Sequence, residues 1–242
     1  VDNDFGNKMP TLAGVWRTAH VNRYVKKVTI GEKNEKGLSV RVDWVLSDIQ
    51  VPYMMEYLIR DNGTIIVTGS IDLTGTKLPE LPRFGMRMEL HQPYENLTYY
   101  GRGPLENYID RYSSSFIGRY ENKVENQFYW YIRPQETGNK TDVRWLTLLD
   151  SEGQGVRITG LQPDAFSALH FSPEDLDPGL TRKLQHTIDI VPQKNIFLHV
   201  DLRQRGLGGD NSWGMYPHNE YRLLDKKYTY SYMIELVEKG SD

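Results

Sequence analysis

Residues 228–236 read YTYSYMIEL, so that large apolar side chains at every second position alternate with mostly polar ones. Successive side chains of a β-strand point to opposite faces, and this period therefore predicts a strand with one buried face. The same alternation recurs in four earlier stretches, residues 40–46, 65–73, 86–91 and 196–202. Many strands with almost no helix predict an all-β fold, a large antiparallel sandwich.

Turn and helix signals favour the same fold class. Short runs rich in turn-forming residues separate the predicted strands, at residues 35–37, 61–63, 151–153 and 178–179. Ser172 begins the one helical pattern, because it precedes a proline and two acids. Pro178 limits that helix to a turn or two. The chain opens on VDNDFG, residues 1–6, which reads as a loop.

The length of 242 residues allows one large all-β domain or two small ones. Residues 75–82, GTKLPELP, read either as a linker between two units or as a long loop within one sandwich. We favour the loop and expect residues 1–242 to form a single β-sandwich domain.

Composition argues against several kinds of partner. The net charge is −3, whereas nucleic-acid binding calls for a basic face. No apolar stretch approaches the roughly 20 residues that a membrane helix needs. The chain has no Cys, and its six His never occur at metal-site spacings such as HxxxH, so we expect no disulfide, metal or cofactor. A soluble protein of either the cytoplasm or the periplasm fits this composition.

Residues 205–214, RGLGGDNSWG, place one large aromatic side chain in a loop. The glycines permit unusual backbone angles and close approach, and Asp210, Asn211 and Ser212 favour local turns. Trp213 in such a loop offers a flat apolar platform with one N–H donor, which suits a sugar ring. Alternatively, the segment is a hairpin whose Trp packs on its own sheet. On this segment alone the hairpin is slightly favoured.

Three further loops gather polar and aromatic side chains, at residues 2–6, 101–111 and 133–145. The nearest carboxylate pairs in them are Glu106 with Asp110 and Asp2 with Asp4. A glycosidase needs two acids roughly 5–10 Å apart, one with a raised pKa, and the sequence shows no apolar pocket for either pair. We expect the acids near Arg111 and Arg144 to be ion-paired staples, and no catalytic residue in this chain.

His199 and Asp201 share one face of a predicted strand, since residues two apart in a strand point the same way. On a concave sheet the two side chains would bond sugar hydroxyls. A solvated or hydrogen-bonded strand face is the favoured alternative.

Taken together and in this order, five segments carry a resemblance to the C-terminal domain of the β-galactosidases of glycoside hydrolase family 2. They are residues 1–6 (VDNDFG), 81–86 (LPRFGM), 99–111 (YYGRGPLENYIDR), 133–146 (RPQETGNKTDVRWL) and 201–214 (DLRQRGLGGDNSWG). In some members of that family the region is a separate small subunit. The resemblance implies a supersandwich similar to the galactose mutarotase fold.

The resemblance also implies an activity for the complete protein, the hydrolysis of terminal non-reducing β-D-galactosides with retention. In the family the catalytic glutamates and metal sites lie on a TIM barrel N-terminal to this region. The expected partners are therefore that barrel and a galactoside substrate, and the chain alone is expected to be inactive. The family motif begins upstream of Val1. We therefore expect the sandwich to be truncated at its N-terminal side, with an exposed edge that pairs with another copy in a homo-oligomer.

Site residues follow from the same resemblance. Trp213 takes the place of an aromatic side chain that stacks under the sugar or aglycone in the barrel's active-site mouth. Asn3 and Asp4 lie in a segment near the same mouth, with Gly6 as a hinge. The remaining candidates for substrate binding are Asp210, Glu136 and Arg144.

Two other functions stay open. An aldose 1-epimerase would need an acid–base pair of one histidine and one glutamate. The best candidates are Glu136 with either His170 or His199. A stand-alone carbohydrate-binding domain would use a pocket formed by Arg144, Glu136 and Asp210.

Overall fold

The structure, a computed structural model, describes residues 1–177, 179, 185–211 and 213–240. Within these residues the chain is dominated by eleven antiparallel strands, which confirms the predicted all-β sandwich. The strands are β1 (Arg23–Ile30), β2 (Leu38–Leu46), β3 (Val51–Ile59), β4 (Ile65–Asp72), β5 (Arg83–Leu90), β6 (Asn96–Gly103), β7 (Phe116–Lys123), β8 (Lys140–Leu149), β9 (Gly155–Leu169), β10 (Ile196–Gln204) and β11 (Lys227–Val237).

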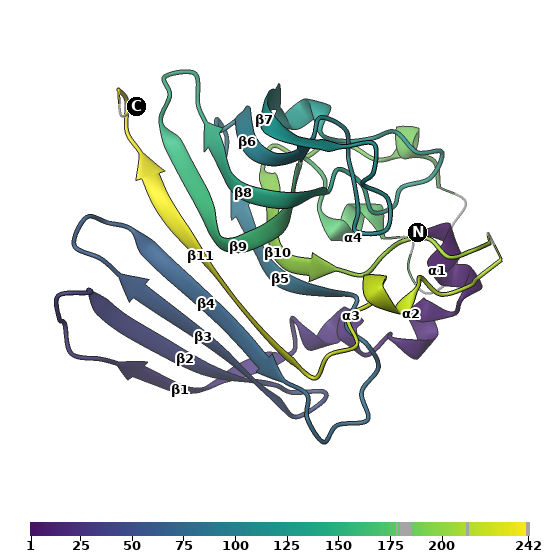
Figure 1. Ribbon diagram of the computed structural model, residues 1–242, viewed down its shortest axis with the longest axis horizontal. Helices are drawn as coiled ribbons and strands as arrows, with labels where there is room; N and C mark the ends of the chain where they lie inside the picture. Colours follow the sequence, from purple (N-terminus) through teal and green to yellow (C-terminus); the bar gives the residue numbers. More distant parts are fainter. Residues whose placement is uncertain (178, 180–184, 212, 241–242) are drawn as a thin grey trace.

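The strands pair in the order β1-β2-β3-β4-β11-β9-β8-β6-β7, and β10 pairs with both β9 and β5. The long strand β9 makes the branch possible. Its first part pairs with β11 and β8, and its last part, residues 165–169, pairs with β10. Figure 1 shows the outcome, a broad wall of β1–β4 and β11 facing a more curved wall that contains β5–β10.

The core lies where aromatic side chains from both walls meet. The ring centroid of Phe84 on β5 lies 5.6 Å from that of Tyr228 and 5.5 Å from that of Tyr230, both on β11. It lies 6.4 Å from the ring centroid of Tyr53 on β3. Tyr228, Tyr230 and Tyr232 are each at most 6% exposed. The alternation that predicted a buried face on this strand is therefore confirmed for its tyrosines, which join the two walls.

Two details of the alternation are corrected. Leu236, near the C-terminal end of β11, is 76% exposed. Strand β10 is buried on both faces, since Leu198 lies in the main core while Phe197 and Asp201 on the other face are only 4% and 1% exposed. A strand between two neighbours and covered on both sides has no solvated face.

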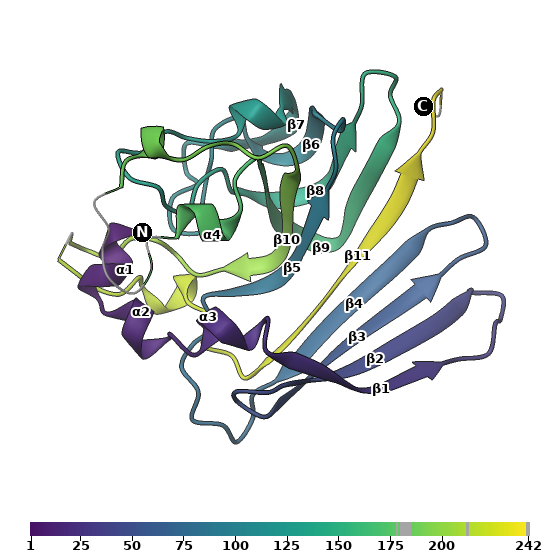
Figure 2. The ribbon, with the colours of Figure 1, turned by 180° about the vertical axis from the view of Figure 1, so that it is seen from behind.

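The N-terminal segment is helical rather than a loop. It forms α1 (Asp2–Gly6), α2 (Met9–Leu12) and α3 (Trp16–Ala19), which Figure 2 shows at one end of the sandwich. Helices of one turn are too short to show a periodic pattern in sequence. The other short helices are η1 (Val124–Asn126), α4 (Pro173–Leu176), η2 (Thr187–Asp189) and η3 (Asn219–Tyr221).

Helix α4 confirms the predicted single turn. The Ser172 hydroxyl accepts a hydrogen bond from the Asp175 backbone N–H at 3.1 Å, and the Asp175 carboxylate accepts one from the Ser172 N–H at 2.8 Å. These reciprocal bonds satisfy donors that the helix would otherwise leave unpaired. Pro178, expected to end the helix, and Ser212, expected in a turn, lie outside the described residues.

The segment at residues 75–82 connects β4 to β5 and so crosses from one wall to the other. Leu73 and Leu81 at its ends are 2% and 4% exposed and belong to the same core. Strand β1 lies at one end of the pairing order, and all eight of its residues are exposed. Within the described residues, no helix has the length and apolar character needed to cross a membrane.

Lys140, the first residue of β8, is a buried cation. It is 2% exposed, and its ammonium donates to Gln127 Oε1 at 3.1 Å and to the Gly138 carbonyl at 3.2 Å. Burial disfavours the charged form and lowers the pKa of Lys140 to about 8, an effect that the Glu106 carboxylate partly offsets.

This burial predicts a pH dependence of stability. Below pH about 8, Lys140 is charged in both the folded and the unfolded protein. Between pH about 8 and the ordinary lysine pKa of 10.5, only the unfolded protein keeps this proton. The free energy of unfolding should therefore rise across this range by up to about 1.4 kcal/mol per pH unit. Denaturant titrations of the wild type and Lys140→Met should show the rise only in the wild type. Lys26→Met, at an exposed position on β1, is the control, and equal slopes in all three proteins would contradict the assignment.

Candidate functional site

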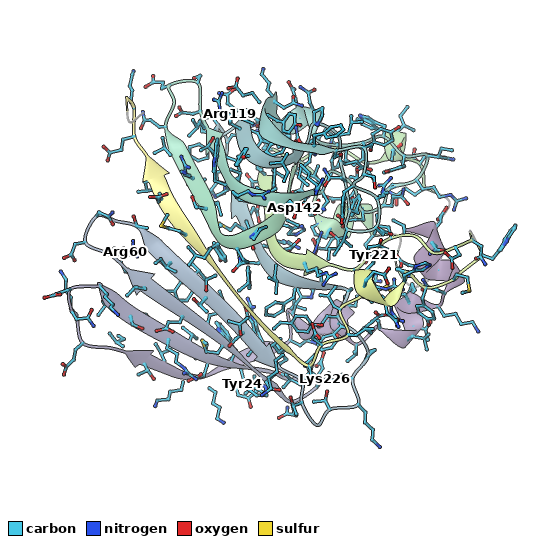
Figure 3. All side chains as sticks on the ribbon, viewed as in Figure 1. Tyr24, Arg60, Arg119, Asp142, Tyr221 and Lys226 are labelled. Atoms are coloured by element: carbon cyan, nitrogen blue, oxygen red, sulfur yellow. The ribbon has the colours of Figure 1, made fainter. Side chains whose placement is uncertain are left out.

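Segments that lie far apart in the sequence meet at the end of the sandwich that carries the short helices. Figure 3 labels Tyr221 there, the last residue of η3, while Arg60 at the turn after β3 lies at the opposite end. The five segments that carry the family resemblance make hydrogen bonds or close contacts with one another at this end, described in turn below. We call it the loop end.

The N-terminal helix α1 holds the Trp213 loop. Asn3 donates from its amide to the carbonyls of Leu207 at 3.4 Å and Met215 at 3.2 Å. Asp4 accepts a 2.8 Å hydrogen bond from Arg205, which is only 3% exposed. Of the two residues predicted to bind substrate, Asn3 thus bonds the backbone of the loop and Asp4 pairs with the side chain of Arg205 at its start.

Two glycines allow the close approach of α1 and the loop. A Cβ on Gly214, where φ is +120°, would lie 2.3 Å from the Gly6 carbonyl carbon. A Cβ on Gly6 would lie 3.0 Å from the Gly214 Cα. Gly6 is therefore packed against the loop, and its expected role as a free hinge is corrected.

Asp110, from the segment 99–111, braces the loop from another side. Its Oδ2 accepts from the Gly208 backbone N–H at 2.7 Å. A Cβ on Gly206 would lie 2.9 Å from the Asp110 carboxyl carbon, so the carboxylate sits against bare backbone. Asn211 adds the predicted local turn, because its Oδ1 accepts from the Trp213 N–H at 2.9 Å.

The segments 99–111 and 133–146 are themselves interlocked. Glu106 accepts from the Gly138 N–H at 2.7 Å and pairs with Arg111 at 2.7 Å, as expected of an ion-paired staple. Asn139 donates to the Asn107 carbonyl at 2.8 Å, and both amides are 1% exposed. Residues 140–145, predicted as loop, begin strand β8 instead.

A charged cluster forms around Arg83, from the segment 81–86. Its Nε lies 2.9 Å from Asp201 Oδ2, and its Nη2 donates to Glu136 Oε1 at 3.2 Å. Asp201 is 1% exposed and lies across Gly85, where a Cβ would come within 1.9 Å of Asp201 Oδ1. The ion pair with Asp201 and the hydrogen bond to Glu136 hold the planar guanidinium in one arrangement. Asp201 is buried and ion-paired, so this strand face is not solvated.

A cavity of about 440 Å³, called the larger cavity below, opens beside the loop. It is lined by Asp110, Arg111, Tyr131, Gln135, Glu136, residues 207–210, His218 and Tyr221. Asp210 Oδ1 pairs with His218 Nε2 at 2.8 Å, and this hydrogen bond raises the pKa of the exposed His218. Glu136 and Asp210, both predicted to bind substrate, thus face one cavity.

Trp213 projects from the loop, and its side chain is 85% exposed. The hairpin alternative, with the indole packed on its own sheet, is therefore wrong.

Arg144 lies apart from the other candidates. It donates to the Asp142 carbonyl and lies 5.8 Å from the Tyr100 ring centroid, and it does not line the larger cavity. The acid of that segment, Asp142, pairs with Arg102 rather than with Arg144.

The two histidines considered for an acid–base pair differ in their surroundings. His170 bonds Glu95 at 3.1 Å and the Asn195 carbonyl at 3.1 Å. His199 Nδ1 lies 3.1 Å from Arg83 Nη1, so His199 and Glu136 share one guanidinium. In the described part of the chain, no three His, Asp or Glu side chains are arranged to hold a metal ion.

Comparison with known proteins identifies the family. A sequence model of the β-galactosidase small chain matches residues 1–234. The chain belongs to this β-galactosidase small-chain family. It is 33% identical over 235 residues to a β-galactosidase of Priestia megaterium (strain DSM 319 / IMG 1521) and 34% identical over 241 residues to a β-galactosidase of Streptococcus thermophilus.

Each of these alignments covers 97% of the chain but 22% of the relative. The chain therefore spans about a fifth of the length of the β-galactosidases that it matches. Among solved structures, the crystal structure of Aspergillus nidulans amine oxidase superposes with a TM-score of 0.31 at 8% identity over 88% of this chain and 36% of that one. That value is too low to support an argument.

Two residues of the loop end were not predicted. Arg83 and Arg205 each hold acids from distant segments, and both lie within the family segments. The sequence signal that could have identified these two residues is an arginine next to a glycine or a proline inside a family segment. Its partners were not readable, because they lie tens to hundreds of positions away.

The glycine contact yields a test of how the loop is held. Gly214→Ala in the full-length protein introduces both an unfavourable φ and a clash with Gly6, and should lower the stability by about 2 kcal/mol or more. Gly153→Ala is the matched control, because that glycine has φ +86° with no atom near its added Cβ. Thermal unfolding measures both. Equal losses in the two variants would show that the α1–loop contact is unimportant.

Proposed function

We propose that the chain is the C-terminal part of a β-galactosidase that hydrolyses terminal non-reducing β-D-galactosides. Its membership of the small-chain family and its match to one fifth of two longer β-galactosidases support this role. In this proposal the catalytic glutamates lie on a TIM barrel elsewhere in the protein, and the described chain completes the active site from one side.

The exposed indole of Trp213 carries the proposal. A large aromatic side chain is 85% exposed, yet its loop is held by α1, by Asp110 and by Asn211. An exposed ring on a braced loop suits stacking against a partner, because little freedom is lost when the partner binds. We assign Trp213 to the mouth of the catalytic cleft, where it stacks on the sugar or the aglycone.

The other candidates divide into two roles. Asp210 and Glu136 face the larger cavity below the loop and are proposed to meet polar groups of the substrate or the barrel. Asn3 and Asp4 act as positioning residues, because they hold the loop through Leu207, Met215 and Arg205. Arg144 has no place in this proposed site.

The alternative of an aldose 1-epimerase is less well supported by the geometry. A guanidinium only donates, so His199 Nδ1 must accept from Arg83. Burial and the charge of Arg83 lower the pKa of His199 well below its usual range, so the ring is neutral. A histidine held neutral in this way is poorly suited to deliver a proton to a ring oxygen.

The exposed edge strand β1 is the proposed contact in a homo-oligomer. All eight of its residues are exposed, and its unpaired side offers backbone donors and acceptors to another copy. The strand has a bulge between Val25 and Lys27, and Lys26 and Lys27 carry charges there. Both features disfavour pairing of this edge with an arbitrary strand, so the contact requires a matching partner.

The role of Trp213 is tested by Trp213→Ala in the full-length enzyme. Loss of the stacking face should raise KM for a nitrophenyl β-galactoside about 5- to 30-fold, because an aromatic contact contributes about 1–2 kcal/mol. The kcat should change by less than about threefold, since the reacting groups lie elsewhere. Steady-state kinetics provides both constants.

Two further variants control this experiment. Trp213→Phe keeps an aromatic face and should restore much of the lost affinity. Leu236→Ala removes an equally exposed apolar side chain at the far end of β11 and should leave KM unchanged. An unchanged KM for substrate and acceptor sugars in Trp213→Ala would remove the proposed role.

The absence of catalytic groups is tested on the 242-residue chain itself. The purified chain should neither hydrolyse a nitrophenyl β-galactoside nor accelerate the mutarotation of fresh α-galactose, whereas the full-length enzyme should hydrolyse the galactoside. Absorbance and polarimetry measure the two reactions. Accelerated mutarotation would favour the epimerase, and hydrolysis by the chain alone would place the catalytic acids within it.

A further inference from the structure

A second cavity lies next to the larger one and has a different lining. This smaller cavity measures about 200 Å³ and shares Gln135 and Glu136 with its neighbour. It is several times larger than the roughly 30 Å³ that one water occupies in the liquid, so a single ordered water does not fill it. The rest of its lining comes from Val1, Asp2 and Thr137, from β9 and β10, and from residues at and beside helix α4.

His199 presents a fixed hydrogen-bond donor to this cavity. Its Nδ1 lies 3.1 Å from Arg83 Nη1 and 3.4 Å from Ser167 Oγ. Because a guanidinium cannot accept a hydrogen bond, Nδ1 is the acceptor and the proton of the neutral ring is on Nε2. The tautomer is thus set by Arg83, and His199 lines the cavity with its donor nitrogen free of that contact.

Acceptors lie on the same wall. Glu136 lines the cavity and uses only Oε1 for Arg83, at 3.2 Å. The Ser167 hydroxyl, which both donates and accepts, is on β9 opposite His199 in the strand pairing. Arg83 is itself held by Asp201 at 2.9 Å and by Gln204 at 2.6 Å, so the polar wall is preorganised rather than mobile.

Another part of the lining is apolar, and Phe197 adjoins His199 on the same face of β10. Phe171 and Phe197 line the cavity together with Leu169 and Leu176. Phe171 and Phe128 are packed with their ring centroids 4.5 Å apart, which stiffens that wall. A small chamber that combines aromatic surface with carboxylate, hydroxyl and N–H groups suits a pyranose, whose C–H face is apolar and whose hydroxyls are both donors and acceptors.

We propose that the smaller cavity is a second sugar-binding site, which holds one monosaccharide unit against Phe171 and Phe197 and within reach of Glu136, Ser167 and His199. Glu136 accepts from sugar hydroxyls and His199 donates to one. The site is separate from the Trp213 platform and does not depend on hydrolysis by the parent protein. Its position beside the larger cavity allows a sugar to be held near the cleft while another is processed.

Equilibrium dialysis of labelled D-galactose against the full-length protein tests the site. Two sites per chain are expected in the wild type. His199→Phe should weaken one of them about tenfold and Ser167→Ala about threefold to tenfold, through the loss of one hydrogen bond each. Trp213→Ala should weaken the other site. Ser115→Ala is the matched control, because Ser115 and Ser167 are both 2% exposed and Ser115 lines neither cavity.

The outcomes separate the two proposals. A site that responds to His199→Phe and Ser167→Ala but not to Trp213→Ala supports the inference, even if the protein hydrolyses no galactoside. Binding that responds only to Trp213→Ala overturns it and shows that water alone occupies the smaller cavity. Thermal unfolding of each variant identifies any that fails to fold, and Ser167→Ala, which only removes a hydroxyl, remains informative in that case.

Discussion

The buried guanidinium of Arg205 is the contact on which the loop end depends. It is 3% exposed, pairs with Asp4 at 2.8 Å and Glu80 at 3.4 Å, and lies 5.6 Å from the Tyr216 ring centroid. Removal of one member of a buried ion pair leaves an uncompensated charge, which is far more harmful than the loss of an exposed pair. One side chain therefore joins α1, the β4–β5 connection and the Trp213 loop.

The charged residues of the family segments are mostly used in such internal contacts. Glu106 and Asp110 each accept from a distant backbone N–H, and Asp201 pairs with Arg83. Their combined effect is to fix one end of a sandwich so that a single aromatic side chain is held out from it. The chain matches about a fifth of the length of two β-galactosidases, and in the proposed function it supplies geometry and a binding surface rather than the catalytic acids.

The sequence predicted what depends on local pattern. The tyrosine alternation of residues 228–232 and the Ser172 cap were readable because strand pleat and helix capping act within a few residues. The burial of both faces of β10 could not be predicted from the sequence, because it depends on which segments cover the strand. The partners of Arg83 and Arg205 could not be predicted either, since tertiary packing brings them together. Glu136 and Asp210 line one cavity, whereas Arg144, chosen with them, lies on strand β8.

The central claim is that Arg205 and α1 hold the Trp213 loop in place, and hydrogen exchange tests it most directly. The Gly208 and Trp213 amides are both bonded, to Asp110 and Asn211. In Arg205→Met these amides should exchange about tenfold faster or more, while amides of the buried strand β10 keep their wild-type rates. Unchanged exchange at Gly208 and Trp213 would show that the loop is held without Arg205, contrary to this account.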